Sequence, residues 1–400
     1  MKINEKTWTF IKRHADEDVR KVALQGAKDP EVDLTMALQQ IAGRQTARKK
    51  LSSWAAVEGI VYPPHLNMEQ CSSEQTARYK AQLAGEGESM VDLTGGFGVD
   101  FYWMSQGFKR RCYVEQDVQL CAISSENFRL LGHHCDAVCG SASDYLREMD
   151  PVSLIYLDPA RRNEHGGRTY SIADCTPNVL ELLPLLMEKG DRVMLKLSPM
   201  LDWRKAVNDL QHVSEVHIIS VDNECKELLL VLSREAGEGL RLCCVNNGNS
   251  FEVLSRHVNA LRITTEGPSI VIRFPANWDE AAFLYEPNAS IMKAGCFAEL
   301  CERYPVEQVA QNSHLFLSSV EIDDFPGRSF RIEAISSMNK QEISQKVSVL
   351  KSANISVRNF PLTVDQLRKK LKLKDGGSAY IFATTVLNGE HKLFICRKIS

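Results

Sequence analysis

The sequence has no long apolar run. The longest candidate, Val179 to Met187, is interrupted by Glu181 and Pro184 and is far shorter than the ~18 uninterrupted residues that a membrane span requires. Residues 1–12 carry lysines but no apolar segment followed by small residues, so we expect no secretory signal. These absences favour a folded protein of the cytoplasm that makes no contact with a membrane.

Cysteine is sparse and irregularly placed. The 12 cysteines include no Cys-x-x-Cys pair, which argues against a disulfide scaffold and predicts reduced thiols. His133, His134, Cys135 and Cys139 are close in sequence, but they span a predicted helix end and the following strand. Their side chains would diverge, so we predict no metal site. A Walker loop and a Ser-His-Asp order are also missing.

The remaining composition is that of a globular protein. Charged residues make up 25% and hydrophobic residues 44% of the 400 residues, which excludes a disordered chain and allows two or three domains. The net charge of −3 is unevenly distributed: residues 321–400 hold 14 lysines and arginines against 8 acids, a net +6, and the rest carries −9. A basic C-terminal module suggests contact with a polyanion, although such a charge is also common in proteins that bind no nucleic acid.

The sequence pattern changes along the chain, from helical to sheet-forming segments. Residues 1–86 have apolar residues at spacings of three and four, which predicts helices. Ser72 and Gln75 match a capping box and predict a helix that ends near Leu83. We expect four domains: a helical region at 1–86, a sheet domain at 87–235, a β-rich connecting domain of unresolved topology at 236–319, and an α+β domain at 320–400.

The sheet domain shows short apolar strands that alternate with amphipathic helices, the pattern of a parallel sheet with helices on both faces. The last two strands are too close together for a helix between them, so they should form an antiparallel hairpin. The seven predicted strands are Met90–Leu93, Arg111–Glu115, Ala137–Cys139, Leu154–Leu157, Val193–Leu197, Val216–Val221 and Leu228–Leu232. The C-terminal domain is predicted to contain strands at 330–335, 355–359, 380–387 and 393–397 and helices at 341–350 and 364–370.

Glycines follow the first strand of the sheet domain. Gly95, Gly96 and Gly98 would let the backbone approach a ligand closely at the carboxyl edge of the sheet. The dinucleotide fingerprint G-x-G-x-x-G is not present, since Phe101 occupies the third glycine position. The alternative is that these glycines only form a tight turn.

Acidic residues at three successive strand ends favour a cofactor. Asp92 suits an ammonium group, Glu115 suits the two hydroxyls of a ribose, and Asp144 follows the third strand, where it would suit an adenine amino group. We therefore predict an S-adenosylmethionine site. Its methionine end would contact Asp92, Thr94, Gly95, Gly96 and Gly98.

The fourth strand ends in Asp158-Pro159-Ala160-Arg161-Arg162, which resembles the D-P-P-[YFW] motif of methyltransferases that act on exocyclic amines. In that motif the carboxylate and a backbone carbonyl position the amine, and the aromatic ring stacks on the base. The resemblance implies catalytic roles for Asp158 and Pro159. Here Arg161 replaces the aromatic residue.

Three basic residues near this motif are candidate substrate contacts. Arg161 and Arg162 could stack on a base or bind a phosphate, or they could pair with Glu164 or Asp174 as a structural brace. Lys196, at the end of the fifth strand, could orient the substrate or extend to solvent.

Residues 89–233 resemble a class I S-adenosylmethionine-dependent methyltransferase. The segments Asp158–Arg162 and Leu195–Pro199, together with a tail that contains Ile355–Pro361, Leu367–Leu373 and Tyr380–Thr384, resemble a bacterial group with a C-terminal THUMP-like domain. The resemblance implies a Rossmann-like α/β fold with a seven-stranded sheet whose last strand is antiparallel. It also implies activity on RNA. We predict methylation of an exocyclic amine of a base, with rRNA or tRNA as partner and no obligatory protein partner.

Two other functions are consistent with the sequence. The acceptor could be a protein side chain or a small amine, since Arg161 breaks the base-stacking motif. Alternatively, the protein could bind RNA through a methyltransferase fold that has lost its activity.

Two runs of basic residues occur in the sequence, at 44–50 and at 368–374. In the second run they alternate with Leu371 and Leu373, which is typical of a solvated helix whose apolar face packs.

Overall fold

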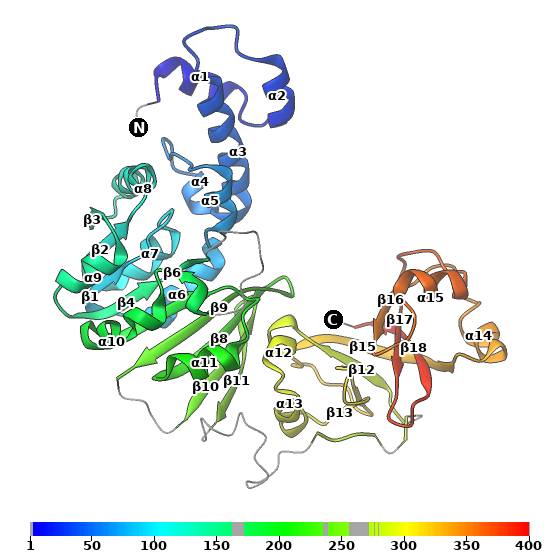
Figure 1. Cartoon of the computed structure of the whole chain (residues 1–400). Helices are drawn as coiled ribbons and strands as arrows, with labels where there is room; N and C mark the ends of the chain where they lie inside the picture. Colours follow the sequence, from blue (N-terminus) through cyan, green and yellow to red (C-terminus); the bar gives the residue numbers. More distant parts are fainter. Residues whose placement is uncertain are drawn as a thin grey trace. The chain divides into compact units, whose positions relative to one another are not determined.

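The computed structural model describes residues 3–161, 172–234, 239–255, 272–275, 277–278 and 280–399 (Figure 1). The chain divides into two compact units. The first comprises Met1–Val216 and Glu227–Leu240, and the second comprises His217–Lys226 and Arg241–Ser400. Within the described ranges, none of the helices has the length and apolar character needed to cross a membrane.

Six helices precede the sheet of the first unit, as the N-terminal periodicity predicted. They are α1 (Glu5–Arg13), α2 (Val19–Gln25), α3 (Leu34–Lys50), α4 (Ser52–Ala55), α5 (His65–Gln70) and α6 (Glu74–Ala84). A small core of Ile11, Val22, Ala37 and Ile41 joins the first three. The predicted cap of α6 is displaced by one residue: Ser73, rather than Ser72, accepts the hydrogen bond from the Thr76 amide.

All seven strands predicted for the sheet domain are present. They are β1 (Gly87–Asp92), β2 (Phe108–Glu115), β3 (Asp136–Cys139), β4 (Val152–Leu157), β7 (Gly190–Leu197), β8 (Val213–Val221) and β9 (Glu224–Ser233). Strands β3, β2, β1, β4 and β7 pair in parallel in that order, and β9 pairs antiparallel with β7. Two further strands, β10 (Leu240–Asn246) and β11 (Asn249–Ser255), extend the sheet to nine, in the order β11-β10-β8-β9-β7-β4-β1-β2-β3.

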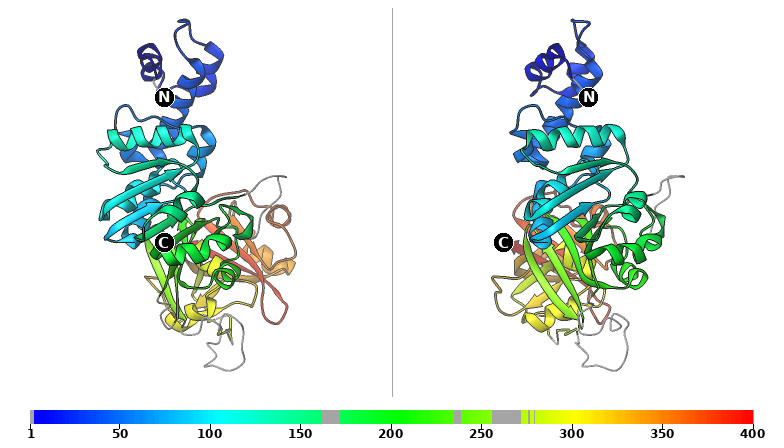
Figure 2. Two further views of the ribbon diagram at one scale, coloured as in Figure 1. Left: turned by 60° about the vertical axis from the view of Figure 1, so that its left-hand side comes forward. Right: turned by 90° about the vertical axis from the view of Figure 1, so that its left-hand side faces the viewer.

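Helices alternate with these strands and form two packed groups (Figure 2). Helices α7 and α8 pack through Phe101 and Phe128, whose ring centroids are 5.4 Å apart, whereas α10 contacts α9, α11 and β7. The elements are α7 (Val99–Met104), η1 (Ser105–Gly107), α8 (Val118–Leu130), α9 (Ala142–Glu148), η2 (Ile172–Asp174), α10 (Val179–Lys189) and α11 (Trp203–Leu210), with a small pair of strands, β5 (Ala160–Arg161) and β6 (Cys175–Thr176). Because the central strands are parallel, their carboxyl ends meet at one edge, where polar side chains follow buried apolar runs.

The second unit contains a seven-stranded sheet in the order β13-β14-β12-β15-β18-β17-β16. Its strands are β12 (Phe283–Pro287), β13 (Glu307–Gln308), β14 (Phe316–Ser318), β15 (Gly327–Ser337), β16 (Asn354–Arg358), β17 (Ala379–Thr385) and β18 (His391–Lys398), and its helices are α12 (Ala289–Ala294), α13 (Phe297–Arg303), α14 (Lys340–Lys346) and α15 (Val364–Leu371). The elements predicted for the C-terminal domain are all present, although α14 ends well before Leu350. Leu367, Leu371 and Leu373 are buried in its core, as their spacing predicted.

Candidate active site

Three predicted acidic residues lie at the ends of three adjacent strands. Asp92 ends β1, Glu115 ends β2 and Asp158 directly follows β4, and β1 pairs with both of the other strands. The Asp158 amide donates a hydrogen bond of 2.6 Å to the hydroxyl of Thr94. The parallel sheet therefore brings Asp92, Thr94, Glu115 and Asp158 to one edge, as the sequence predicted for a ligand site.

The glycine loop after β1 is shaped by aromatic side chains as well as by its backbone. A Cβ atom at Gly95 would lie 2.0 Å from the Tyr113 ring, and one at Gly98 (φ +80°) would lie 2.4 Å from the Phe128 ring. A Cβ atom at Gly96 (φ +56°) would have the Thr94 carbonyl oxygen as its nearest neighbour, at an ordinary contact distance of 3.8 Å. Packing thus accounts for Gly95 and Gly98, whereas no close contact would exclude a side chain at Gly96.

Glu115 holds this loop in place. It is 9% exposed, and its carboxylate accepts hydrogen bonds from the amides of Gly96 (2.7 Å) and Asp117 (2.8 Å), one on each oxygen. Each carboxylate oxygen retains a second lone pair. The arrangement therefore fixes the loop and still allows Glu115 to accept hydrogen bonds from two hydroxyls.

Asp92 is a buried carboxylate that forms no ion pair with any described lysine or arginine. It is 1% exposed, and among the described residues it accepts one hydrogen bond, of 3.0 Å, from the Thr94 amide. Burial, reinforced by the charges of Asp100, Asp158 and Glu115, raises the pKa of Asp92 well above its ordinary value. An ammonium group next to Asp92 would compensate this charge, so the donor set fits the amino group of an amino-acid moiety.

Asp144 is placed differently from the other predicted cofactor residues. It lies in the first turn of α9, its side chain is 71% exposed, and it pairs with Arg147 at 2.7 Å. The structure records no contact between Asp144 and Asp92 or Glu115 within the described ranges. A contact between Asp144 and adenine stays a prediction.

Asp158 forms an ion pair with Lys196, which lies near the end of the neighbouring strand β7. The Lys196 ammonium is 2.5 Å from Oδ2 of Asp158, whose side chain remains 37% exposed. Loss of hydration at its buried position raises the pKa of Asp158 above its ordinary value, although the positive charge of Lys196 lowers it in part. Pro159 is buried directly after it. One oxygen of Asp158 is thus held by Lys196, and no described residue donates a hydrogen bond to the other.

The two arginines of the motif are described only in part. The backbone of Arg161 pairs with Cys175 in the small β5–β6 sheet, and Arg162 and Glu164 lie outside the described residues. Neither the substrate role nor the brace is tested. Over the ranges that the structure describes, no group of three His, Cys, Asp or Glu side chains could hold a metal ion.

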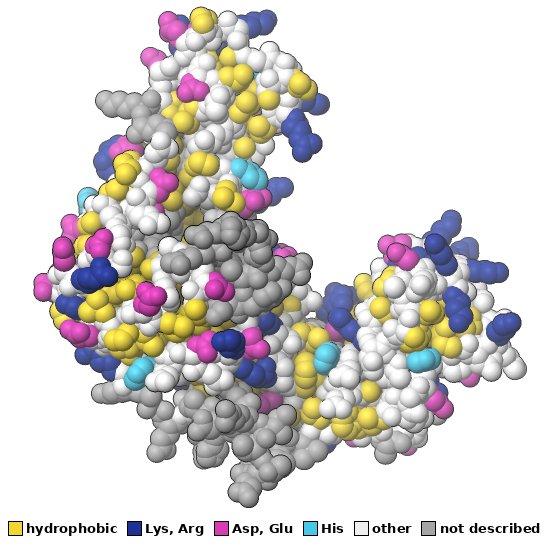
Figure 3. All heavy atoms as spheres, viewed as in Figure 1, with side chains coloured by type: hydrophobic (Ala, Val, Ile, Leu, Met, Phe, Trp, Pro, Cys, Tyr) yellow, Lys and Arg dark blue, Asp and Glu magenta, His cyan; other side chains and the backbone are white. Residues whose placement is uncertain are grey.

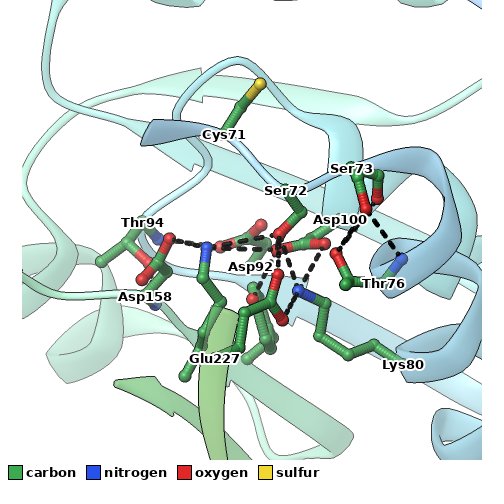
Figure 4. Close-up of polar contacts among 12 residues, drawn as sticks. Cys71, Ser72, Ser73, Thr76, Lys80, Asp92, Thr94, Asp100, Asp158 and Glu227 are labelled. Atoms are coloured by element: carbon green, nitrogen blue, oxygen red, sulfur yellow. Dashed lines mark hydrogen bonds and ion pairs between the residues drawn. The ribbon is translucent and has the colours of Figure 1, made fainter. Parts of the chain in front are cut away.

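A buried ion cluster behind Asp158 was not predicted. It consists of Ser72, Lys80, Asp100, Tyr156, Lys196 and Glu227 (Figure 4). Lys80 is fully buried and contacts Asp100 at 2.9 Å, Glu227 at 2.5 Å and the Ser72 hydroxyl at 2.7 Å. The Ser72 hydroxyl also lies 2.8 Å from Asp100. This use of Ser72 explains why Ser73 caps α6 in its place.

Part of this cluster could have been predicted from the sequence of α6. The buried residues of α6 are Thr76, Ala77, Lys80 and Ala84, so Lys80 occupies the apolar stripe that faces the core. A lysine in such a stripe requires a buried counter-charge. The partner residues could not be identified in this way, because Asp100 and Glu227 are distant in sequence.

Two of the basic residues of α3, Arg48 and Lys50, make local contacts. Arg48 pairs with Asp16, and Lys50 donates hydrogen bonds to the carbonyls of Met68 (2.9 Å) and Glu69 (2.8 Å). In the second unit, by contrast, lysine and arginine side chains gather over α14 and α15 (Figure 3). Six exposed lysines there have no ion pair with any described residue; this basic face comprises Lys340, Lys351, Lys369, Lys370, Lys372 and Lys374.

Comparisons with known proteins agree with this architecture. A family model described as THUMP domain-like matches residues 327–398, and one described as a ferredoxin-like domain matches residues 283–326. The crystal structure of a candidate methyltransferase from Porphyromonas gingivalis W83 is 29% identical, with 100% of both chains covered and a TM-score of 0.84. No curated protein sequence matches the chain.

Other solved structures match only part of the chain. A candidate RNA methyltransferase from Pyrococcus horikoshii is 15% identical, with 46% of this chain and 97% of that chain covered and a TM-score of 0.33. TrmK of M. capricolum, solved with S-adenosyl-homocysteine, is 11% identical, with 42% and 70% covered and a TM-score of 0.32. At these TM-scores neither bears on the function of this chain. The sheet order and the similarity over the full length show that the chain has the fold of the class I methyltransferases and carries a C-terminal THUMP-like domain, as the sequence resemblance predicted.

Proposed function

We propose that the protein transfers a methyl group from S-adenosylmethionine to an exocyclic amine of an RNA base. The observation that carries the proposal is the position of Asp158. Its carboxylate is held on one oxygen and partly exposed, it precedes a buried proline, and it lies at the same sheet edge as Asp92 and Glu115. That edge is where parallel α/β sheets bind their ligands.

The residues at this edge suit the cofactor. Asp92 would pair with the ammonium group of its methionine end, which relieves the cost of a buried carboxylate that has no cationic partner in the described part of the chain. Glu115 would accept hydrogen bonds from the ribose hydroxyls, and the missing side chain at Gly96 would allow the cofactor a close approach. Asp144 would contact the adenine.

When bound, S-adenosylmethionine supplies an electrophilic methyl group. The residues of this chain then act by positioning. The free oxygen of Asp158 accepts a hydrogen bond from one N–H of the amine, and the backbone carbonyl of Pro159 accepts one from the other, so the nitrogen lone pair is directed at the methyl carbon. The methyl group would pass from the sulfonium sulfur, which leaves as a neutral thioether, to the amine nitrogen. The nitrogen then carries an extra proton, and Asp158, whose pKa is raised by burial, would accept it.

The second unit supports RNA as the acceptor. The six lysines of the basic face are exposed and have no ion pair with any described residue. Lysines in this state attract phosphates, and their binding releases the counterions that surround the nucleic acid. The match to the THUMP domain-like family falls on the same part of the chain.

The test is transfer of labelled methyl from S-adenosylmethionine into RNA from cells that lack the gene, with native protein and Asp158→Ala in parallel. Label in RNA from the native protein alone supports the proposal. Cofactor binding by calorimetry without label in RNA would favour a protein or small amine as acceptor, since Arg161 replaces the stacking aromatic residue. RNA binding without cofactor binding would indicate a fold that has lost its activity.

A further inference from the structure

Lys196 was predicted to contact the substrate, but its surroundings indicate a different role. An ammonium group has three N–H donors. Three acceptors surround it: Oδ2 of Asp158 at 2.5 Å, the hydroxyl of Ser72 at 3.3 Å and Oδ2 of Asp100 at 3.6 Å. Its side chain is 10% exposed. Lys196 thus donates hydrogen bonds to Asp158 and Ser72 and forms a longer ion pair with Asp100, so its ammonium is directed into the ion cluster.

The acceptors of Lys196 belong to a connected set. Asp100 lies between two buried lysines, with Oδ1 at 2.9 Å from Lys80 and Oδ2 at 3.6 Å from Lys196, and the Tyr156 hydroxyl donates to it at 2.7 Å. Burial opposes the charge of Lys196, but Asp158, Asp100 and Glu227 outweigh it and raise the pKa of Lys196. Lys196 therefore stays charged in the interior.

We propose that Lys196 is a positioning residue that acts through Asp158. Its ammonium, anchored by Asp100 and Ser72, fixes Oδ2 of Asp158 and thereby aims the other oxygen at the acceptor amine. The proposal rests on the methyl transfer proposed above and extends it to a residue that does not touch the substrate. A buried ion pair of this kind orients its partner, and loss of one member leaves the other charge uncompensated.

The experiment compares two buried lysines of the same cluster. Lys196→Met removes the cation that contacts Asp158, and Lys80→Met removes one that contacts Asp100 and Glu227 but not Asp158. Both variants lose stability, which thermal unfolding measures. Only Lys196→Met is expected to lower kcat for methyl transfer, by 100-fold or more, while KM for RNA and the dissociation constant of the cofactor change less than about threefold.

The pH profile adds a readout that a structural role would not affect. Among the described residues, the charged groups that face Asp158 are Lys196 from β7, Lys80 from α6, Asp100 from α7 and Asp92 from β1. Without Lys196, the acid limb of kcat/KM moves to higher pH, because Asp158 loses the cation nearest to its carboxylate. A shift of the same size in Lys80→Met would overturn the proposal.

Two further measurements do not depend on activity. Binding of RNA, followed by fluorescence anisotropy, should be the same for Lys196→Met and the native protein, whereas a substrate contact predicts weaker binding. A crystal structure of Lys196→Met should show the Asp158 carboxylate rotated away from its native orientation; an unchanged Asp158 would refute the positioning role. Absence of methyl transfer by the native protein would instead count against the proposed function.

Charge-balanced variants replace the single ones if those do not fold. Lys196→Met with Asp100→Asn removes one cation and one anion, and Lys80→Met with Glu227→Gln does the same in the part of the cluster that does not touch Asp158. The first pair should lose transfer and disorder Asp158, and the second should keep both. Equal rates in the two pairs would contradict the proposal.

Discussion

Asp92 and Glu115 end neighbouring strands of the same sheet but accept different numbers of hydrogen bonds from backbone amides. Glu115 accepts one backbone amide on each oxygen, whereas Asp92 accepts one amide in total within the described ranges, although it is the more deeply buried of the two. The site therefore contains one carboxylate whose charge is compensated locally and one whose charge is not. The second is the residue expected to respond to a cationic ligand.

Affinity for S-adenosylmethionine should depend on pH through Asp92. Because burial raises the pKa of Asp92, its carboxylate becomes protonated as the pH falls through that raised value, and the attraction to the ligand's ammonium group is lost. Affinity should thus rise with pH. Asp92→Asn should weaken binding by about 10- to 100-fold at high pH and flatten the dependence. Calorimetry between pH 5 and pH 8 measures both; a native affinity that does not vary with pH would contradict the role of Asp92.

Alanine substitutions at Gly96 and Gly98 should distinguish a glycine needed for cofactor binding from one needed for packing. Gly98→Ala places a methyl group against the Phe128 ring at a positive φ, so it should lower the free energy of unfolding by about 2–5 kcal/mol. Gly96→Ala would meet the Thr94 carbonyl oxygen only at an ordinary contact distance and should cost about 1–2 kcal/mol, from its positive φ alone. Denaturant unfolding gives these values. Gly96→Ala should nevertheless weaken cofactor binding; normal binding by this variant would show that the loop does not approach the ligand.

Asp158→Ala should bind the cofactor within a few-fold of the native affinity and lose methyl transfer by at least about 100-fold, since positioning of the amine is lost. Single-turnover transfer into RNA checks the rate, and calorimetry checks binding. A variant with near-native transfer would remove Asp158 from the mechanism.

Replacement of Lys369, Lys370, Lys372 and Lys374 by glutamine should weaken RNA binding and leave cofactor affinity unchanged. These side chains are exposed, while the leucines between them hold α15 to the sheet, so the fold is retained. If all four contact phosphates, the slope of log affinity against log salt should become shallower by about 3. Anisotropy titrations at several salt concentrations provide this slope, and an unchanged slope would place the RNA contact elsewhere.

The strands and the acidic residues at their ends were predictable from sequence because both follow from short-range patterns. An apolar run that ends in Asp92 or Asp158 predicts a buried strand with a polar group at its carboxyl end, and a parallel sheet then brings such groups together. The cause of glycine at positions 95 and 98 was not predictable. It depends on the rings of Tyr113 and Phe128, which come from β2 and α8.

The role of Lys196 was beyond sequence reasoning for a similar reason. A lysine at a strand end is compatible with solvent, with substrate or with a buried partner, and the choice depends on Ser72 and Asp100, which lie more than 90 residues away in the chain. The extension of the sheet by β10 and β11 was missed because no regular pattern distinguishes these strands from an independent β-rich domain.

The position of Glu227 late in the chain affects the order in which the protein can fold during synthesis. It is the last residue of the ion cluster to leave the ribosome, more than 140 residues after Lys80. Until β9 has been synthesised, Lys80 has Asp100 as its single carboxylate partner in the cluster, and burial of the α6 stripe remains unfavourable. The sheet edge that carries Asp92 and Asp158 should therefore become rigid late in synthesis. A nascent chain that ends before Glu227 should remain sensitive to protease in α6.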